Sequence, residues 1–476
     1  MKNSIIYLFV ILAAITACSD SMELDTEKYY PSLEYAFIEQ ADFIFPKSAS
    51  SYQTKVESSC DWRCVSDCDW ISIEKSVDGK SITISVAENK VSPTRSGKIL
   101  FYNEDRLLSS SSVVQAPAMS ANCYMISKAG TYAFSAVKGN TEESLEAIES
   151  VDVLWETYGT AGTPEKGSLI KSATYQNGLI SFTTSDKFRE GNAVIAAKDG
   201  NGKILWSWHI WLTDQPQEQV YYNNAGTLMD RNLGATSATP GDVGALGLMY
   251  QWGRKDPFPG PGILGSITAS KESSIYQDMT QSYCFNPNQK SITGFNTVQN
   301  ISTGTEGDIA YSVAHPTTNI HYNTAGNVGA TNTWLYSIDQ SDALRLWRSK
   351  GATDKSGKTN YDPCPPGYIV PVNNYGWNSA TDNPMWTNNI IWETNGLSGF
   401  IYNQSETNKT YYPAVGYRAA GQLKNVGFAC YYWTGDAFME SGALLARGLG
   451  HETRSKINVG TKLQTQFALP IRCMKQ

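Results

Sequence analysis

The chain contains little of the chemistry that a metal site or a nucleic-acid site needs. Only four histidines occur in 476 residues, and no two of them have a spacing typical of metal ligands. Charged residues make up 17%, the net charge is −7, and no basic stripe is present, which argues against nucleic acid as a partner. The sequence also lacks a nucleophile elbow, a phosphate loop, an HExxH motif and an EF-hand loop. No catalytic group, metal or cofactor is therefore predicted.

Long apolar runs are missing as well, apart from a short one at the N-terminus. Residues 5–15 are almost wholly apolar, Lys2 precedes them, and small residues lead from them into Cys18. Crossing a bilayer takes about 20 apolar residues, so this run is too short to span a membrane. The three-part pattern is typical of a secretory signal. On the residues alone, Cys18 is either part of that signal or incidental to it.

The same residues resemble a bacterial lipoprotein signal, in which Ala17 precedes the cysteine and Ile15 lies three positions before it. The resemblance implies that residues 1–17 are removed and that Cys18 is lipidated. The lipid would be the only anchor, because no second apolar stretch of membrane length occurs. Several acyl chains on one cysteine give stable attachment. The expected location is the outer membrane, exposed at the cell surface.

Aromatic residues are abundant. The chain has 13 Trp and 27 Tyr, aromatic residues make up 12%, and hydrophobic residues make up 41%. The hydrophobic content is ample for packed cores, and the length is that of roughly three domains. Such a profile suits secreted β-rich proteins whose rings face sugars, but β-sheets favour aromatic residues in any case. Both interpretations stay open.

The first folded segment is predicted at residues 39–117. Residues 18–38 before it are polar and acidic, which predicts a flexible tether. Residues 81–86 alternate apolar and polar side chains, residues 98–102 form a second strand-like run, and Asp78-Gly79 is typical of a hairpin turn. Several short strands at this spacing predict a small β-sandwich.

Six residues of this segment fall in a recognisable order: Trp62, Trp70, Asn89, Arg95, Gly97 and Gln115. With them the segment resembles the BACON domain, an immunoglobulin-like module of Bacteroidetes surface proteins. The two tryptophans are expected to pack in the core and at an edge. Cys60, Cys64 and Cys68 depart from the family pattern. Three cysteines without a fourth ligand make a poor zinc site, and whether two of them form a disulfide stays open.

Residues 118–217 predict a second β-sandwich. Its closing run, residues 204–212, carries three tryptophans at strand spacing: Trp206, Trp208 and Trp211. Side chains of a strand alternate between its two faces, so two core rings and one ring toward solvent or an interface are expected. His209 is expected to be a core or edge histidine. The opening residues 121–124 and this closing run resemble a module of Bacteroidetes fimbrillin-like proteins.

The remaining residues, 218–476, are rich in Gly, Asn, Thr and Trp, and long loops are expected. Short helices are predicted at residues 243–250 and 341–349. Five motifs occur in order, at residues 229–235, 250–258, 361–371, 432–434 and 467–473. With these motifs the segment resembles the FISUMP family of exported bacterial proteins and, more widely, the C-type-lectin-like superfamily. The comparison implies that Cys364 and Cys473 form a structural disulfide.

Several charged residues of this segment have a chemical interpretation. Asp230 and Arg231 are predicted to form a buried or half-buried ion pair. Lys255 and Asp256 either line a pocket or form a salt bridge in a turn. Three carboxylates lie among tryptophans: Glu393, Asp436 and Glu440. A glycosidase needs two carboxylates held at a narrow separation, which the sequence does not give, so this third interpretation stays open.

Recognition is predicted at four aromatic residues, Trp377, Trp386, Trp392 and Tyr402, in a segment whose long loops are expected to hold further rings at Tyr411, Tyr412 and Trp433. Rings give a large contact area at small entropy cost, and neighbouring amides give adaptable hydrogen bonds. Trp377 and Trp386 are the better surface candidates, because they lie in the polar stretch 373–389. The alternative for each ring is packing inside a loop-rich core.

Together these features predict a mainly β, multidomain chain, with two immunoglobulin-like β-sandwiches followed by a loop-rich α+β C-type-lectin-like domain. The predicted function is that of a non-catalytic surface lipoprotein that binds a glycan or a host or bacterial surface protein. The alternative is a fimbria-associated structural or anchoring subunit, with fimbrial subunits as partners. A glycan-processing enzyme is the third interpretation.

Overall fold

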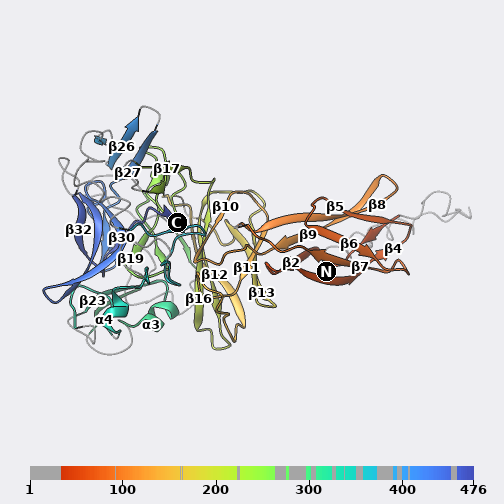
Figure 1. The fold of residues 1–476 in the computed structure, drawn as a ribbon, viewed down its shortest axis with the longest axis horizontal. Helices are drawn as coiled ribbons and strands as arrows, with labels where there is room; N and C mark the ends of the chain where they lie inside the picture. The colour runs from red at the N-terminus through yellow and green to blue at the C-terminus, as the bar shows by residue number, and fades with distance from the viewer. Residues whose placement is uncertain are drawn as a thin grey trace, which may run out of the picture. The chain divides into compact units, whose positions relative to one another are not determined.

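The computed structural model describes residues 34–91, 93–160, 162, 164–221, 226–262, 275–277, 296–301, 307–323, 329–336, 338–349, 357–372, 390–393, 399–405, 408–451 and 458–476. This part of the chain is mainly β, with many short strands and few helical turns (Figure 1). It contains no helix that is long and apolar enough to cross a membrane. We call residues 34–117 the N-terminal block, 118–217 the middle block and 218–476 the C-terminal block.

The chain divides into two compact units. One holds the described residues up to Ala41 together with Ser51–Ser85 and Lys98–Ser112. The other holds Asp42–Ser50, Val86–Gly97 and Val113–Gln476, and thus includes the whole of the middle and C-terminal blocks.

The N-terminal block consists of β-strands. They are β1 (Ala36–Phe37), β2 (Asp42–Phe45), β3 (Ser50–Lys55), β4 (Glu57–Ser58), β5 (Arg63–Ser66), β6 (Ile71–Lys75), β7 (Ser81–Val86), β8 (Arg95–Asn103) and β9 (Arg106–Gln115). The sheets have the strand orders β2-β9-β8-β5 and β3-β7-β6, and β1 pairs with β4. The strand-like runs predicted at residues 81–86 and 98–102 are confirmed.

The block begins earlier than the sequence pattern predicts. Ala36, expected in the tether, is buried and pairs with Ser58. A strand as short as β1 has too few residues to show an alternation, which is why its pattern was not visible. The turn before β7 is as predicted, since Gly79 has a φ of +66°, a conformation that glycine adopts without steric cost.

Residues of the ordered motif set meet inside the N-terminal block. Arg95 Nε donates to Gln115 Oε1 at 2.8 Å, and both side chains donate to the carbonyl of Ala87, at 2.6 and 2.9 Å. Trp62 is buried, and its ring lies 5.5 Å from that of Phe101. The motif residues therefore serve packing and backbone hydrogen bonding.

The middle block contains two sheets. Its strands are β10 (Cys123–Ile126), β11 (Thr131–Ser135), β12 (Ser150–Thr157), β13 (Ile170–Gln176), β14 (Leu179–Thr184), β15 (Gly191–Lys198) and β16 (Ile204–Leu212). One sheet has the order β11-β14-β13 and the other β10-β16-β15-β12-β21. The last strand, β21 (Ile275–Gln277), comes from the C-terminal block.

The two sheets of the middle block pack face to face on an apolar cluster. Trp206 and Trp208 of β16 lie in it, together with Phe134 and Phe182 from the other sheet. Trp211 points to the opposite face of β16, where it joins a different cluster. The prediction of two core rings and one outward ring is therefore confirmed, and the outward ring faces the C-terminal block.

The C-terminal block combines many short strands with long connections. Its strands besides β21 are β17 (Glu218–Val220), β18 (Thr227–Met229), β19 (Met249–Gln251), β20 (Pro257–Phe258), β22 (Asn296–Ile301), β23 (Thr318–Asn323), β24 (Tyr368–Ile369), β25 (Ile390–Glu393), β26 (Gly399–Ser405), β27 (Asn408–Pro413), β28 (Tyr417–Ala419), β29 (Gln422–Lys424), β30 (Cys430–Glu440), β31 (Ala443–His451), β32 (Asn458–Gln464), β33 (Ala468–Leu469) and β34 (Met474–Lys475). The sheets are β17-β18-β34-β24, β20-β19-β33-β28-β29, β22-β23, β25-β26-β27 and β30-β31-β32.

Helices in this block are shorter than predicted. The helix expected at 243–250 is a single 3-10 turn, η1 (Val243–Ala245), which ends before Gly247, where φ is +72°, and β19 follows. The helix expected at 341–349 is the shorter α4 (Gln340–Ala343), and its N-cap is Asp339. A further helix, α3 (Ile309–Ala314), was not predicted.

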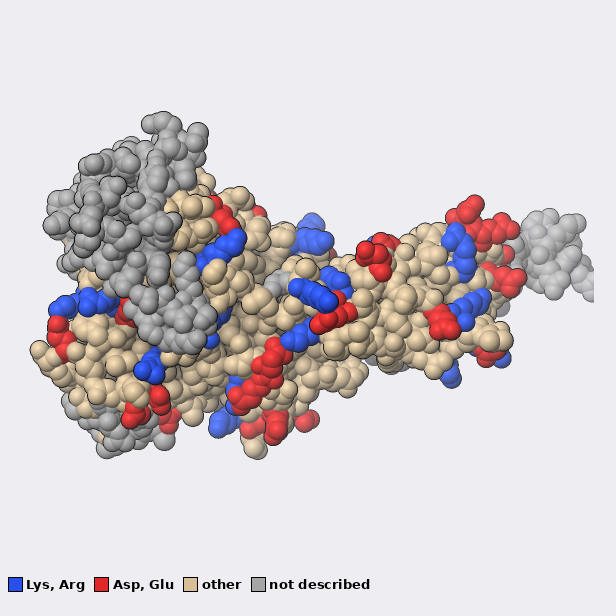
Figure 2. All heavy atoms as spheres, viewed as in Figure 1, with Lys and Arg blue, Asp and Glu red and all other residues tan. Residues whose placement is uncertain are grey.

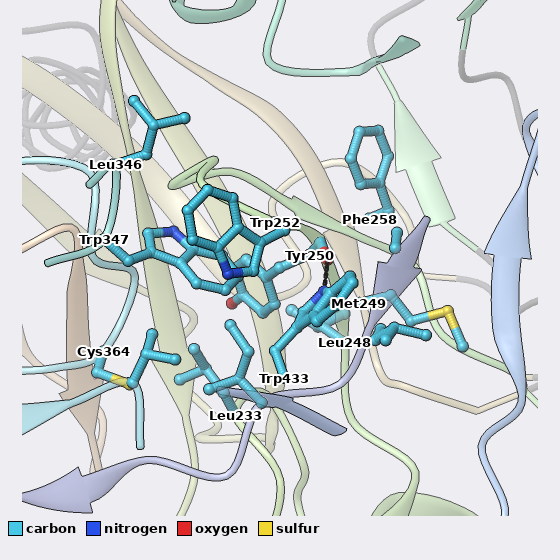
Figure 3. Close-up of a cluster of buried hydrophobic side chains, with 14 of the residues drawn as sticks. Leu233, Leu248, Met249, Tyr250, Trp252, Phe258, Leu346, Trp347, Cys364 and Trp433 are labelled. Atoms are coloured by element: carbon cyan, nitrogen blue, oxygen red, sulfur yellow. Dashed lines mark hydrogen bonds between the residues drawn. The ribbon is translucent and has the colours of Figure 1, made fainter. Parts of the chain in front are cut away.

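The middle and C-terminal blocks share one hydrophobic core. Its centre holds Trp252, Trp347, Trp433 and Tyr250, and Trp433 Nε1 donates to the carbonyl of Tyr250 at 2.8 Å (Figure 3). Trp211 of the middle block belongs to the same cluster. The hydrophobic core is therefore continuous across the domain boundary predicted near residue 218. Whether the two blocks fold independently on either side of that boundary stays a prediction.

Candidate functional site: a buried junction of the sequence motifs

Residues of several sequence motifs converge on one place, the face of β16 that meets the C-terminal block. We call this set the motif junction. From the middle block it contains Asn122, Asn192, Ser207, His209 and Trp211, and from the C-terminal block Gly234, Ala235, Tyr250, Lys255, Asp256 and Asp362. Ser207, His209 and Trp211 alternate along β16 and so share one face.

The most chemically suggestive group of the junction is Ser207 with Lys255 and Asp256. Lys255 Nζ donates to Ser207 Oγ and to Asp256 Oδ1, each at 2.6 Å, and Ser207 Oγ donates to Asp256 Oδ1 at 2.6 Å. A serine beside a lysine amine can act as an activated nucleophile. Here Ser207 is 1% exposed and Lys255 and Asp256 are 3% exposed, so substrate has no access to them.

Burial also governs the charge state of this group. Burial lowers the pKa of Lys255, while the neighbouring Asp256 carboxylate opposes the shift. The ammonium lies 4.7 Å from the ring centre of Trp206. Of the two sequence-based interpretations of Lys255 and Asp256, the salt bridge is confirmed, and the pair holds β16 against the chain that follows β19.

His209 is a core histidine, as predicted, and both of its ring nitrogens have partners. Its Nε2–H donates to Asn192 Oδ1 at 2.9 Å, since an amide oxygen only accepts, and its Nδ1 accepts from the Tyr250 hydroxyl at 3.2 Å. Asn192 Nδ2 in turn donates to the carbonyl of Gly234 at 2.9 Å. Burial lowers the pKa of His209 to about 3. The ring therefore links two strands of the middle block to two motifs of the C-terminal block.

Asn122 connects the opening motif of the middle block to the motif at residues 361–371. Its Nδ2 donates to the carbonyls of Asn360 and Asp362, at 2.7 and 2.9 Å, and its Oδ1 accepts from Trp206 Nε1 at 3.0 Å. Gly139 lies beside it with a φ of +56°, and a Cβ there would come within 2.3 Å of the Asn360 carbonyl oxygen. Only glycine fits such close contact.

Asp362 and Lys358 shape the loop that carries Cys364. The Asp362 carboxylate accepts from the backbone N–H of Cys364 and of Val370, at 2.8 and 2.9 Å. Lys358 Nζ donates to the carbonyls of Cys364 and Tyr368, each at 2.7 Å. The Asp362 carboxylate thus bonds buried N–H groups, and the Lys358 ammonium bonds buried carbonyl groups. An irregular segment in a core needs such partners, because its backbone groups are not paired within a helix or sheet.

The predicted disulfide between Cys364 and Cys473 is confirmed. The two Cα atoms are 5.9 Å apart and the sequence separation is 109 residues. Closing a loop of this length stabilises the fold by about 4–5 kcal/mol in the chain-entropy model. The bond joins the loop shaped by Asp362 to the chain terminus.

The neighbouring Arg472 ties the terminus to the sheet β25-β26-β27. Its guanidinium donates to Asn232 Oδ1 at 2.9 Å, to the carbonyl of Tyr411 at 2.6 Å and to Thr410 Oγ1 at 3.1 Å, and it lies 3.9 Å from the ring centre of Tyr412. Arg472 is fully buried. It therefore fixes β27 relative to the disulfide.

The ion pair predicted between Asp230 and Arg231 is confirmed. Arg231 Nε lies 2.9 Å from Asp230 Oδ1, and both side chains are largely buried. Arg231 also pairs with Asp214 of the middle block. The pair thus belongs to the contact between the two blocks.

The four predicted recognition residues are not part of the motif junction. The other three rings expected in long loops, Tyr411, Tyr412 and Trp433, are instead buried in strands β27 and β30, so they pack in the core. Trp377 and Trp386 lie outside the described residues, as does Cys18. The backbone of Trp392 is in β25 and that of Tyr402 in β26, while their side chains lie outside what the structure describes. Their role in binding stays a prediction.

The strand register gives the backbone context of these two positions. Ile390 pairs with Tyr402, and Tyr402 pairs with Thr410 of β27. Positions 392, 402 and 410 therefore share one face of the sheet. Of these three residues, Thr410 is the one whose side chain is described, and it is buried.

The carboxylates considered for glycoside cleavage are spread over two sheets. Glu393 ends β25, whereas Asp436 and Glu440 are on β30. Glu440 forms an ion pair with Lys462 of β32. Among the described residues, no group of three His, Cys, Asp or Glu side chains forms a candidate metal site.

The cysteines of the N-terminal block are present as thiols. Burial raises the pKa of Cys64 to about 12, and burial together with Asp67 raises that of Cys68 to about 11. Cys68 Sγ donates to Asp67 Oδ1 at 3.1 Å. Thiolate is the reactive form of cysteine, so these two side chains are poor nucleophiles at neutral pH.

Comparisons with known proteins add little to this geometry. No family model and no curated protein match the sequence. Tandem Ig repeats of Dlar are 9% identical, with a TM-score of 0.15, over 38% of this chain and 98% of that one. Domains 5–6 of the S-layer protein SbsC are 12% identical, with a TM-score of 0.16, over 38% and 98%.

A Bacteroides ovatus GH5 xyloglucanase in complex with a heptasaccharide is 11% identical, with a TM-score of 0.16, over 30% of this chain and 29% of that one. Scores this low carry no argument about fold or function. The functional proposal below therefore rests on the residues of this chain.

Proposed function

We propose that this chain is a surface-attached lipoprotein that recognises a glycan or a surface protein without catalysing a reaction. The observation that carries the proposal is that the motif residues with catalytic potential are buried and bond to one another. Ser207, Lys255 and Asp256 are buried and bonded to one another. Residues with catalytic potential thus build a scaffold, and recognition falls to the segments that the scaffold holds.

The C-terminal block suits a scaffold that presents loops. Val372, directly before the candidate stretch 373–389, is fully buried. After that stretch the chain enters β25, in the sheet whose strand β27 is held by Arg472. Binding residues in proteins are often on loops that a rigid framework positions. Trp377 and Trp386 are the residues we assign to contact with the ligand.

The proposal includes the finer fold assignments. The N-terminal block is proposed to be a BACON-like sandwich, the middle block a fimbrillin-like sandwich and the C-terminal block a FISUMP-like, C-type-lectin-like domain. The bonding of Arg95 with Gln115 supports the first. The pairing of Leu228 with Met474, near the two ends of the C-terminal block, supports the last, because the C-type-lectin-like fold is one that holds its ends together.

The distribution of charged side chains supports ligand recognition by aromatic rings and amides over recognition by ion pairs. On the face in view in Figure 2, acidic and basic side chains are interspersed and do not gather by sign. Recognition of a neutral sugar or of a mixed protein surface suits such a face better than recognition of a polyanion does.

Binding is tested with the double variant Trp377→Ala/Trp386→Ala. Attachment to a glycan array or to host and bacterial surfaces is expected to be lost, while the thermal midpoint stays nearly unchanged. Tyr52→Ala is the matched control, because Tyr52 is an aromatic residue of the N-terminal block with 48% exposure. Intact attachment with a large loss of stability would show that the two tryptophans are core residues, and would remove the proposed site.

Attachment to the membrane is tested with Cys18→Ala. The variant is expected to leave the membrane fraction, because the lipid is the proposed anchor. Labelled acyl chains should appear on the wild type alone. A variant that stays in the membrane fraction, with no acyl label on the wild type, would exclude lipidation at Cys18. Co-isolation of the wild type with assembled pili would instead favour the fimbria-associated alternative.

A further inference from the structure

The five-stranded sheet of the middle block is completed by a strand from another block. β12 pairs with β15 from Ser150 to Thr157 on one side. On its other side it pairs with β21 over three residues, with Thr157 opposite Ile275 and Trp155 opposite Gln277. Among the described residues, no strand pairs with residues 150–154 on that side.

The end of β12 is held by hydrogen bonds that do not involve β21. The Glu156 carboxylate accepts from the backbone N–H of Leu169 and of Ile170, at 3.1 and 2.6 Å. These contacts hold the end of β12 from within the middle block. A preformed edge with backbone groups available is a template for an added strand.

The donated strand is attached to its own chain by long connections. It lies between Gly262 and β22, which begins at Asn296, and Thr157 precedes Ile275 by more than a hundred positions. A second copy would offer the same three residues in the same antiparallel register. Exchange between copies therefore keeps every backbone hydrogen bond, and concentration decides between the two arrangements.

We propose that the edge of β12 is a strand-exchange site, at which β21 of a second copy replaces the chain's own β21. The product is a swapped dimer when two copies exchange reciprocally, and a longer assembly when exchange runs from copy to copy. This inference goes beyond the proposed function. It requires neither a ligand nor the lipid at Cys18.

The proposal is tested by mixing two full-length variants that each gain one cysteine, Thr157→Cys and Ile275→Cys, under mild oxidation. Both carry serine in place of Cys60, Cys64 and Cys68, which removes the half-exposed thiols of the N-terminal block. The bond that counts is the one between position 157 of one copy and position 275 of the other, identified by peptide mapping without reduction, because it forms only if β21 of one copy reaches β12 of the other. Its yield as a fraction of total chain should rise about tenfold for a tenfold rise in concentration, because association of two copies is second order.

The matched control is a mixture of Thr174→Cys with Ser181→Cys. These residues are opposite one another in the hairpin β13–β14, whose short turn prevents exchange. Cross-linking of Thr157→Cys with Ile275→Cys well above this control supports the proposal. Equal cross-linking in both mixtures overturns it. A Thr157→Cys/Ile275→Cys double variant that forms only the bond within one chain, at every concentration, also overturns it.

Discussion

The N-terminal and middle blocks are both made of short strands, but these strands are buried differently. In β7 of the N-terminal block, Ile82, Ile84 and Val86 are buried and the residues between them are partly exposed. In β15 of the middle block, every residue from Gly191 to Lys198 is buried. The first pattern needs one core, whereas the second needs a core on each face of the sheet. The middle block therefore depends on the C-terminal block for its second core.

The largest test of this comparison removes the C-terminal block. A fragment of residues 118–217 would expose Trp155, Val194 and Trp211, which the shared core buries, and burial of one large apolar side chain stabilises by about 1.5–3 kcal/mol. We expect this fragment not to unfold cooperatively in urea, and residues 118–476 to do so, as measured by circular dichroism and tryptophan fluorescence. A sharp transition for the short fragment would break the comparison.

A smaller effect is expected from one residue of the motif junction. Lys255→Met leaves Asp256 buried without its cation, and removal of one partner from a buried pair costs about 3–5 kcal/mol. Lys255→Met/Asp256→Leu should recover much of that loss, because neither member of the pair is then left buried without the other. Free energies of unfolding from urea titrations measure both.

The matched control is Lys462→Met. Lys462 and its partner Glu440 have side chains that are 50% and 43% exposed, so we expect a loss below about 1 kcal/mol. If Lys255→Met cost no more than this control, the junction would not hold the two blocks together as argued.

The smallest effect is a dependence on pH. Because the pKa of His209 is about 3 in the folded chain and 6.5 in its ordinary state, the unfolded chain takes up the proton first as pH falls. Stability should therefore fall below pH 6.5, by at most about 1.4 kcal/mol per pH unit and by about 2 kcal/mol at pH 5. The variant His209→Gln should lack this component.

The measurement compares the free energy of unfolding of the wild type and His209→Gln at pH 7, 6 and 5. Carboxylates titrate in both proteins, so the difference between the two slopes isolates the histidine. Equal slopes would mean that His209 is not held neutral in the folded chain.

Much of the strand content could be predicted because its signal is local. The alternation of residues 81–86 and the nearly continuous apolar run of β15 each lie within one strand. The Cys364–Cys473 bond was predicted from a family resemblance, and the spacing of cysteines alone did not give it. Local periodicity and recognised motifs were thus the two sources of correct prediction.

The partners across the motif junction could not be predicted. Ser207 and Lys255 are 48 positions apart, and Asn122 and Asp362 are 240 apart. Polar residues at alternate positions of a tryptophan-rich strand indicate that one face of the strand forms hydrogen bonds. They do not indicate which segment of the chain supplies the hydrogen-bonding partners. Ser207 and His209 in the run 204–212 were the available signal.

The helix predicted at 243–250 failed for a related reason. Leu246, Leu248 and Tyr250 are fully buried, in a segment that runs from the 3-10 turn through Gly247 into β19. A non-helical segment that is surrounded by core on all sides has a nearly continuous run of apolar residues. The hydrophobic periodicity of such a run does not distinguish it from a short buried helix. Tertiary burial, and not helix propensity, determined the conformation.

The disulfide between Cys364 and Cys473 also bears on what happens when the backbone is cut. A single protease cleavage between these two residues separates the polypeptide but leaves both pieces covalently joined. The strands from β25 to β32 all lie within this interval. A nicked molecule would therefore migrate as one species until it is reduced, and the cut would not shed the candidate binding segment into the surroundings.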